Sequence, residues 1–133
     1  NFIWNAIDWY DTGIGIVNTR GAVVVHNTVV SDVDHTNSFF SSLDYRFPLT
    51  QVEIQNNLVR RITRRADAEG NLLANHEDPP VEFFVDAPAA DLHLTAAATA
   101  AIDAGIPHPQ AGHDIDGQQH SETNPDIGAD EYP

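Results

Sequence analysis

Residues 23–30 read Val-Val-Val-His-Asn-Thr-Val-Val, and residues 52–59 read Val-Glu-Ile-Gln-Asn-Asn-Leu-Val. When residue 23 is placed over residue 52, every second position of the two stretches carries the same kind of side chain. Alternation with a period of two is typical of a β-strand with one buried face. The alignment therefore predicts that six apolar side chains are buried in stacked columns: Val23, Val25, Val29, Val52, Ile54 and Leu58.

The same offset relates an earlier pair of segments, because Ile14 aligns with Leu43 and Ile16 aligns with Tyr45. Two separate strands that keep one offset indicate an internal repeat rather than a chance match. A repeat of about 27 to 29 residues that holds several short strands predicts coils of strands stacked in parallel, about 4.8 Å apart.

Asparagine marks the expected corners of these coils, since Asn27 and Asn56 align when residue 23 is placed over residue 52. Stacked asparagine side chains can hydrogen-bond along a stack, and asparagine tolerates the left-handed backbone of a sharp bend. Ordinary turn chemistry is the alternative. Residues 1–3 align with residues 28–30, so Asn1 falls just past the corner. We therefore expect a chain that begins in mid-coil, as a fragment of a longer protein, with its open N-terminal end covered by upstream coils, a second chain or a second copy.

The charge balance excludes several classes of partner. The chain has six arginines, no lysine and 20 acidic residues, which gives a net charge of −14. Such a surface repels nucleic acid and anionic membranes, and no apolar run approaches the roughly 18 residues of a membrane span. The absence of cysteine excludes disulfides and zinc–thiolate sites. An acidic, lysine-free composition resembles that of proteins from salty or extracellular settings, although a GC-rich genome is an equal explanation. We expect an extracellular or cell-surface location.

The repeat also predicts how the chain is divided. Residues 1–70 are expected to form two to three coils, whereas residues 71–133 lose the repeat and are rich in Pro, Asp, Ala and His. A stack of coils needs a cap over its last apolar layer and its unpaired strand edges. We predict that residues 71–133 form an irregular C-terminal cap packed on the last coil, within one domain.

These segments resemble a known group of proteins, the bacterial right-handed parallel β-helix proteins of the pectate-lyase-like superfamily. The resemblance covers nearly the whole chain and rests on these stretches: residues 23–30, 41–48, 52–59, 84–86, 91–94, 101–105, 114–117 and 125–132. It implies an all-β fold, a right-handed parallel β-helix or solenoid. The superfamily contains polysaccharide lyases, glycoside hydrolases, epimerases and adhesins, so a polysaccharide is the implied ligand. Three functions remain open: part of a polysaccharide-degrading enzyme, a non-catalytic sugar-binding or adhesive solenoid, or a purely structural cap.

Asp44 and Arg46 lie at alternate positions of a predicted strand, so both side chains point to the same face. In lyases of this superfamily a cation neutralises a uronate carboxylate while a base removes the neighbouring proton, often with Ca²⁺ held by acidic residues. The resemblance therefore implies catalytic roles, with Arg46 as the cation and Asp44 as a ligand of Ca²⁺. The alternative is a surface ion pair that contributes under about 1 kcal/mol.

Four of the six arginines fall within six positions: Arg60, Arg61, Arg64 and Arg65. Guanidinium groups bind carboxylate and sulfate in a bidentate manner, which predicts that these residues bind an anionic polysaccharide. Pairing with nearby acidic residues is the alternative.

Two acidic loops are candidate metal or acid–base sites. Residues 114–117, Asp-Ile-Asp-Gly, are similar to a calcium loop but lack EF-hand spacing, so Asp114 and Asp116 are predicted metal ligands with a plain Asx turn as the alternative. Residues 32–35, Asp-Val-Asp-His, suit general acid–base work or a metal, or form a solvated loop. Exposed aromatic side chains would mark a sugar-binding face, and the candidates are Trp4, Trp9 and Tyr10.

Overall fold

The structure, a computed structural model of the 133-residue chain, describes residues 1–6, 11–31 and 41–133. Strands dominate this part of the chain, and the helical segments in it are two short 3-10 turns, η1 (Val81–Phe83) and η2 (Ala87–Ala89). The expectation of an all-β chain is therefore confirmed. None of the helices in the described ranges is long and apolar enough to cross a membrane.

Three parallel sheets make up the N-terminal part of the protein. The first contains β1 (Phe2–Asn5), β4 (Thr28–Ser31), β7 (Leu58–Val59) and β10 (His76–Glu77). The second contains β2 (Thr12–Val17), β5 (Ser41–Arg46) and β8 (Ile62–Arg65). The third contains β3 (Arg20–Val25), β6 (Gln51–Gln55) and β9 (Glu69–Leu73).

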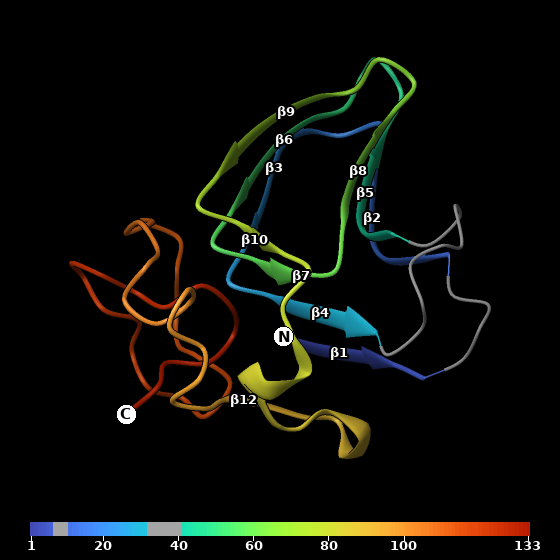
Figure 1. The fold of residues 1–133 in the computed structure, drawn as a ribbon. Coiled ribbons are helices and arrows are strands. Elements are labelled where there is room, and N and C mark those ends of the chain that lie inside the picture. Colours follow the sequence, from blue (N-terminus) through green and yellow to red (C-terminus); the bar gives the residue numbers. More distant parts are fainter. Residues whose placement is uncertain (7–10, 32–40) are drawn as a thin grey trace.

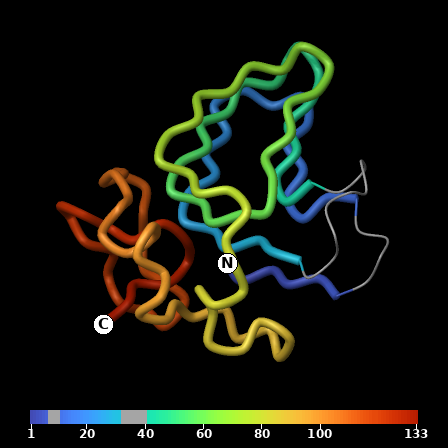
Figure 2. The backbone as a smooth tube through the Cα atoms, viewed as in Figure 1, coloured from blue at the N-terminus to red at the C-terminus, as the bar shows by residue number. Residues whose placement is uncertain are grey.

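Neighbouring strands within each of these sheets are parallel and lie three strands apart along the chain. The chain therefore visits the three sheets in turn, and we call one such passage a round. Figure 1 shows successive strands of one sheet lying over one another, and the tube in Figure 2 follows the same path. A separate antiparallel pair joins β11 (Phe84–Asp86) to β12 (Asp91–Leu94).

The predicted offset is correct in the second sheet, where Ile14 is level with Leu43 and Ile16 with Tyr45. It is wrong by one position in the third sheet, where Val24 rather than Val25 is level with Ile54. The first sheet shows the same shift, because Thr28 of β4 is level with Leu58 of β7 rather than with the residue before it.

The shift has a physical cause in the connections between the second and third sheets. Residues 47–50, which connect β5 to β6, form a longer link than residues 18–19, which connect β2 to β3. A register irregularity between Arg20 and Ala22 takes up one of the two extra positions, and Gly21 lies there with a φ of 72°. One extra position remains, and a shift of one position turns every following side chain to the opposite face of its strand.

The predicted buried set changes accordingly. Four of its six members are buried: Val29, Val52, Ile54 and Leu58. The expectation of one shared set is nevertheless wrong for Leu58, which packs in a separate hydrophobic cluster from the other three. The prediction is wrong for Val23, which is 37% exposed, and for Val25, which is half-buried. Ala22 and Val24 face the core in their place. Because residues 22–25 are all apolar, either register satisfied the sequence pattern.

An asparagine ladder joins the rounds at the corner between the third sheet and the first. It consists of Asn1, Asn27, Asn57 and Asn75. Each Nδ2 donates to the Oδ1 of the next asparagine, over 2.7, 2.8 and 2.9 Å from the first pair to the last. The backbone N–H groups of Asn27 and Asn57 donate to the same oxygens, over 3.1 and 3.0 Å. The corner prediction is thus wrong for Asn56, because Asn57 is the partner of Asn27.

The residue before each of the last three ladder asparagines takes the left-handed conformation that turns the chain. His26, Asn56 and Ala74 have φ values of 51°, 55° and 48°. Asn56 is therefore the counterpart of His26, and the two side chains are hydrogen-bonded over 2.9 Å between Asn56 Nδ2 and His26 Nε2. At each of these corners one residue makes the sharp bend, and the residue after it joins the ladder.

Two hydrophobic cores lie on opposite faces of the first sheet. The inner core, enclosed by the three sheets, contains Ile16, Val29, Leu43, Tyr45, Val52, Ile54, Val59 and Ala68. The outer core contains Val30, Leu58, Phe83, Phe84, Ala87, Leu92, Leu94, Ala98, Ala101 and Ile127. Alternation along β4 and β7 divides their side chains between the two cores. Each large apolar side chain buried there contributes roughly 1.5–3 kcal/mol.

The C-terminal segment, residues 81–133, therefore packs beside the first sheet, as Figure 1 shows. Strands continue to Glu77, beyond the residue 70 at which the coils were expected to end, and β9 is exposed along its whole length. The division into coils and a cap over the last coil stays a prediction.

We predict that Asn57→Ala lowers the free energy of unfolding by about 3 kcal/mol, measured by urea denaturation. The substitution leaves buried donors of Asn27 without an acceptor, and such groups cost about 1–3 kcal/mol each. The control is Asn71→Ala on exposed β9, which should change the free energy by less than about 0.5 kcal/mol. Equal effects of the two substitutions would contradict a structural role for the ladder.

Candidate functional site

A buried carboxylate holds two arginines on the second sheet. Asp44 in β5 has no exposed surface. Arg46 Nε donates to Asp44 Oδ1 over 2.6 Å, and Arg65 Nε donates to Asp44 Oδ2. Arg46 and Arg65 are level with each other on β5 and β8, so their guanidinium groups lie one strand apart. The hydrogen bond to Asp44 raises the pKa of Arg46, which is therefore a permanent cation.

Asp44 thus has both carboxylate oxygens engaged by guanidinium groups, and its sequence neighbour Arg46 is indeed its partner. To act as a general base or to bind calcium, Asp44 would first have to release one of the two guanidinium groups. The geometry makes Asp44 a positioning residue that fixes Arg46 and Arg65. Among the described residues neither Nη atom of Arg46 has a hydrogen-bond partner, so this guanidinium can accept a second anion.

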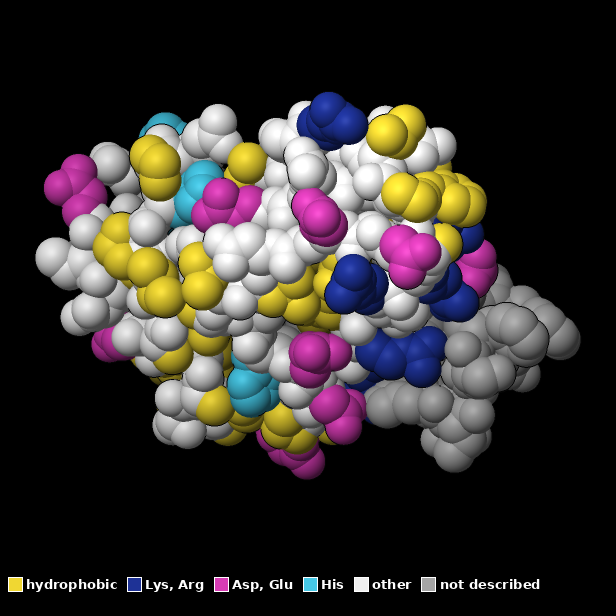
Figure 3. Space-filling model, turned by 90° about the horizontal axis from the view of Figure 1, so that it is seen from above, with side chains coloured by type: hydrophobic (Ala, Val, Ile, Leu, Met, Phe, Trp, Pro, Cys, Tyr) yellow, Lys and Arg dark blue, Asp and Glu magenta, His cyan; other side chains and the backbone are white. Residues whose placement is uncertain are grey.

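The four clustered arginines do not all converge. Arg65 joins Asp44, whereas its neighbour Arg64 lies on the opposite face of β8 and donates to Ala68 O over 2.5 Å. Arg60 Nη1 lies 2.8 Å from Asp78 Oδ1, and Arg61 is half-buried just before β8. In the view of Figure 3, most of the arginine side chains that can be seen lie close together in one patch. Arg46 was not predicted to join these four arginines, but it lies beside Arg65 and shares Asp44 with it.

The predicted metal ligands Asp114 and Asp116 have different surroundings. Asp114 is buried and accepts hydrogen bonds from Asp116 N at 3.0 Å and Gln118 N at 2.7 Å on Oδ1, and from Gln118 Nε2 and Glu131 N on Oδ2. Both of its oxygens are therefore occupied by N–H donors, as in an Asx turn. The side chain of Asp116 is 56% exposed and lies 3.3 Å from His93 Nε2.

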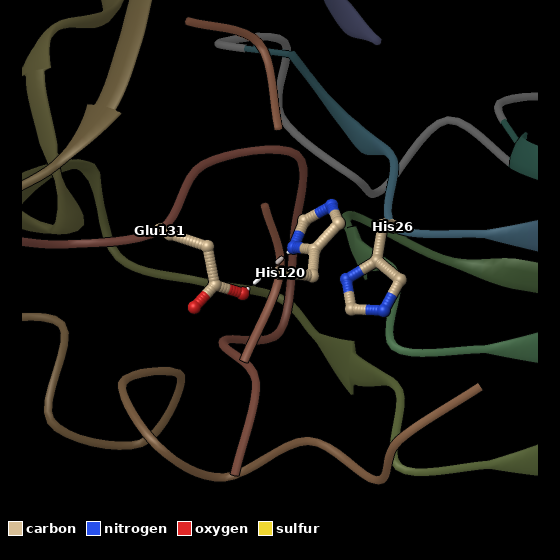
Figure 4. A group of neighbouring side chains, drawn as sticks. All are labelled: His26, His120 and Glu131. Carbon is tan, nitrogen blue, oxygen red and sulfur yellow. Dashed lines mark hydrogen bonds and ion pairs between the residues drawn. The ribbon is translucent and has the colours of Figure 1, made fainter. Parts of the chain in front are cut away.

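A cluster that the sequence did not single out joins the corner of the rounds to the C-terminal segment. His26 directly follows β3, whereas His120 and Glu131 come from the C-terminal segment (Figure 4). The two imidazole rings stack with centroids 3.9 Å apart and planes 29° apart. His120 Nδ1 lies 2.7 Å from Glu131 Oε1, which also accepts from Asp126 N over 2.9 Å. No local sequence motif links these residues, since His26 lies far from the other two along the chain.

The hydrogen bonds of His26 define its protonation state. Nε2 faces the amide nitrogen of Asn56, which can only donate, and Nδ1 lies 3.2 Å from the carbonyl oxygen of Gly128, which can only accept. The ring therefore carries one proton, on Nδ1. Burial, together with the nearby His120 ring, lowers the pKa of His26 to about 4. His26 is neutral at pH 7.

His120 lies between two pockets. One, of about 360 Å³, is lined by His108, Pro109, Ser121 and Glu122 among others, and the second, of about 300 Å³, is lined by residues that include His26 and His113. A carboxylate that fixes an imidazole through one nitrogen leaves the other nitrogen for proton transfer. His120 and Glu131 therefore form a dyad suited to general acid–base chemistry.

The remaining sequence candidates lie elsewhere. Residues 32–35, Trp9 and Tyr10 are outside the described residues. Trp4 is half-buried, packs against the outer core and lines a pocket of about 440 Å³ together with Phe84 and three prolines. Arg60 also lines this pocket.

No protein-family model matches this sequence, and neither the curated proteins nor the solved structures contain a significant match to it.

We predict that stability falls as the pH is lowered from 6.5 towards 4, and that His26→Asn removes much of this dependence. The unfolded chain protonates residue 26 near its ordinary pKa of 6.5, whereas the folded chain resists protonation down to about 4. Through His26 the folded state therefore loses stability in this window and none above it, by at most about 3 kcal/mol. Asparagine suits the left-handed backbone there, since Asn56 occupies the equivalent corner.

The measurement is the free energy of unfolding between pH 4 and pH 8 for the wild type, His26→Asn and the exposed-histidine control His113→Asn. The control should keep the wild-type pH dependence. If His26→Asn also kept it, His26 would not be the buried neutral histidine described above.

Proposed function

We propose that the chain is part of an extracellular right-handed parallel β-helix of the pectate-lyase-like kind, and that it binds an anionic polysaccharide through arginines on the outer face of β5 and β8. The fold part of the proposal is supported by three parallel sheets that the chain visits in turn, with a shared apolar interior. Ladders of asparagine at a corner fit the same architecture, because each round needs the same bend at the same place.

The observation that carries the binding proposal is the pair of guanidinium groups fixed by one buried carboxylate. Holding a long side chain in place before the ligand arrives reduces the conformational entropy lost on binding. Arg46 and Arg65 lie on neighbouring strands and are about one-third exposed, so a carboxylate or sulfate of a sugar chain can reach both. The planar fork of arginine matches these anions.

The same geometry favours binding over catalysis at this site. A lyase needs a base that reaches the proton to be removed, and Asp44 is buried with both oxygens engaged. A second candidate function, acid–base catalysis on a sugar, is favoured by the His120–Glu131 dyad beside its 360 Å³ pocket. The two sites belong to different parts of the chain and can be tested separately.

We predict that the protein binds pectate, alginate or a sulfated glycan at low ionic strength, and that Arg46→Gln and Arg65→Gln each weaken binding at least fivefold by calorimetry. The control is Arg20→Gln at the start of β3, which removes the same charge from the third sheet and should weaken binding less than twofold. Because salt screens the attraction between exposed charges, binding should be much weaker at about 0.15 M salt, where the Debye length is about 8 Å.

Neutral dextran serves as the ligand control, and release of reducing ends or of unsaturated products in the same mixtures reports cleavage. Binding without cleavage supports the binding proposal, and cleavage lost in His120→Gln supports the second candidate. No heat with any anionic polysaccharide at low salt, or equal losses in the three arginine variants, would contradict the binding site.

A further inference from the structure

Three ligand atoms meet on the C-terminal segment, at a place distinct from the arginine pair. His93 lies in β12, Asp116 in the turn at residues 114–117, and Asp130 near the end of the chain. One nitrogen or oxygen from each of the three side chains lies within 4.8 Å of the other two. The site is therefore assembled from three separate segments of the chain.

His93 is held so that its Nε2 faces the two carboxylates. Nδ1 lies 2.5 Å from Asp91 Oδ1, and the imidazole and Phe2 rings pack in a T-shaped arrangement with centroids 5.1 Å apart. Nε2 is buried without a hydrogen-bond partner, although it lies 3.3 Å from Asp116 Oδ2. A carboxylate that binds one nitrogen of an imidazole and directs the other at a common point is the usual support of a metal-ligating histidine.

Asp130 differs from the other buried aspartates of the described residues. Asp44, Asp114 and Asp126 each have hydrogen bonds or ion pairs on both carboxylate oxygens. Asp130 is 4% exposed and accepts one hydrogen bond, from Leu94 N to Oδ2 over 2.6 Å.

The C-terminal part of the chain supplies neither arginine nor lysine to compensate the charge of Asp130. The sequence from residue 66 to residue 133 is rich in Asp and Glu and contains neither arginine nor lysine. Its buried carboxylates depend on backbone N–H groups, on histidine or on a cation from solution. Oδ1 of Asp130 accepts no hydrogen bond from the described residues, and one carboxylate oxygen of Asp130 lies within 4.8 Å of the ligand atoms of His93 and Asp116.

We propose that His93, Asp116 and Asp130 bind a divalent transition-metal ion, of which Zn²⁺ is the representative, through His93 Nε2 and one oxygen of each aspartate. Bonds of about 2.0–2.2 Å in a tetrahedral site place ligand atoms roughly 3.3–3.5 Å apart, which the 3.3 Å between His93 and Asp116 matches. The imidazole ligand favours Zn²⁺ over Ca²⁺, which prefers oxygen ligands alone. Exposed Asp116 gives the ion access from solvent, and water completes the coordination.

The ligand set differs from the one predicted from the sequence. Asp116 is retained, whereas Asp114 is replaced because both of its oxygens already accept hydrogen bonds. The His26–His120–Glu131 cluster is less suited to a metal, since both ring nitrogens of His26 have hydrogen-bond partners. The bound ion would tie β12, residues 114–117 and the chain end together, so it would stabilise the C-terminal segment.

The test uses the full chain, freed of metal with a chelator, at pH 8. Calorimetry should show saturable binding of one Zn²⁺, and Zn²⁺ at 100 times its Kd should raise Tm by about 5 °C or more. Co²⁺ in place of Zn²⁺ should give the visible absorption of a nitrogen- and oxygen-ligated site. Ca²⁺ should bind at least tenfold more weakly than Zn²⁺.

His93→Gln and Asp116→Asn should each weaken Zn²⁺ binding at least tenfold and abolish the Co²⁺ absorption. Asp116 is exposed, so its substitution tests the site even if changes at buried Asp130 prevent folding. His113→Gln and Asp103→Asn, at exposed positions outside the cluster, are the controls and should bind like the wild type.

The proposal is overturned if the wild type shows no saturable Zn²⁺ binding, or if His93→Gln and Asp116→Asn bind as tightly as the wild type. Binding that is lost in His120→Gln and kept in His93→Gln would place the ion at the other histidine cluster. Stronger binding of Ca²⁺ than of Zn²⁺ would refute the assignment of the metal class.

Discussion

The asparagine ladder fixes the register on which the rest of the structure depends. In Asn57 one side chain accepts from the backbone and side chain of Asn27 and donates to Asn75 and to backbone carbonyls. All of these groups are buried or half-buried, so a slip of one position would leave several donors and acceptors unsatisfied. Since side chains alternate along a strand, the same slip would exchange the inner and outer faces of every strand. The ladder therefore stabilises the register that places some residues in the inner core and others against the C-terminal segment.

The repeat and the strands could be predicted from the sequence because alternation is a local property. The register could not, since Val23, Val24 and Val25 are all apolar and Asn56 and Asn57 are adjacent, so two alignments fitted equally well. The deciding features are the longer connection at residues 47–50 and the register irregularity at Gly21. Both features change the register through backbone geometry, so an alignment based on side-chain types does not detect them. The third round is also shorter than the others. Residue 76 in β10 is level with residue 58 in β7, whereas residue 58 is level with residue 28 in β4.

The candidate sites show the same limit. That Asp44 and Arg46 share a face follows from their spacing, and the ion pair between them was one of the expected outcomes. Arg65 reaches the same carboxylate because β8 pairs with β5 in a register that the sequence alignment did not extend to. The partners His26 and His120, or His93 and Asp130, meet only through the folding of the C-terminal segment against the first sheet and on itself. Contacts across such distances carry no periodic signal, so composition and spacing alone could not identify them.

The distribution of charge links the two halves of the molecule. All six arginines lie at or before position 65 of the sequence. In this part of the chain the buried carboxylate of Asp44 is compensated by two of these arginines. In the C-terminal segment the same requirement is met by backbone geometry: Asp114 and Asp126 are each surrounded by N–H groups of tight turns. This explains why the segment can be irregular and still ordered, because each such aspartate replaces the hydrogen bonds that a strand ladder would supply. A segment built in this way uses its carboxylates as acceptors. Asp130 departs from this pattern, because one of its oxygens accepts no hydrogen bond from the described residues and His93 Nε2 nearby has none either. A ligand from solution can complete the contacts of both groups.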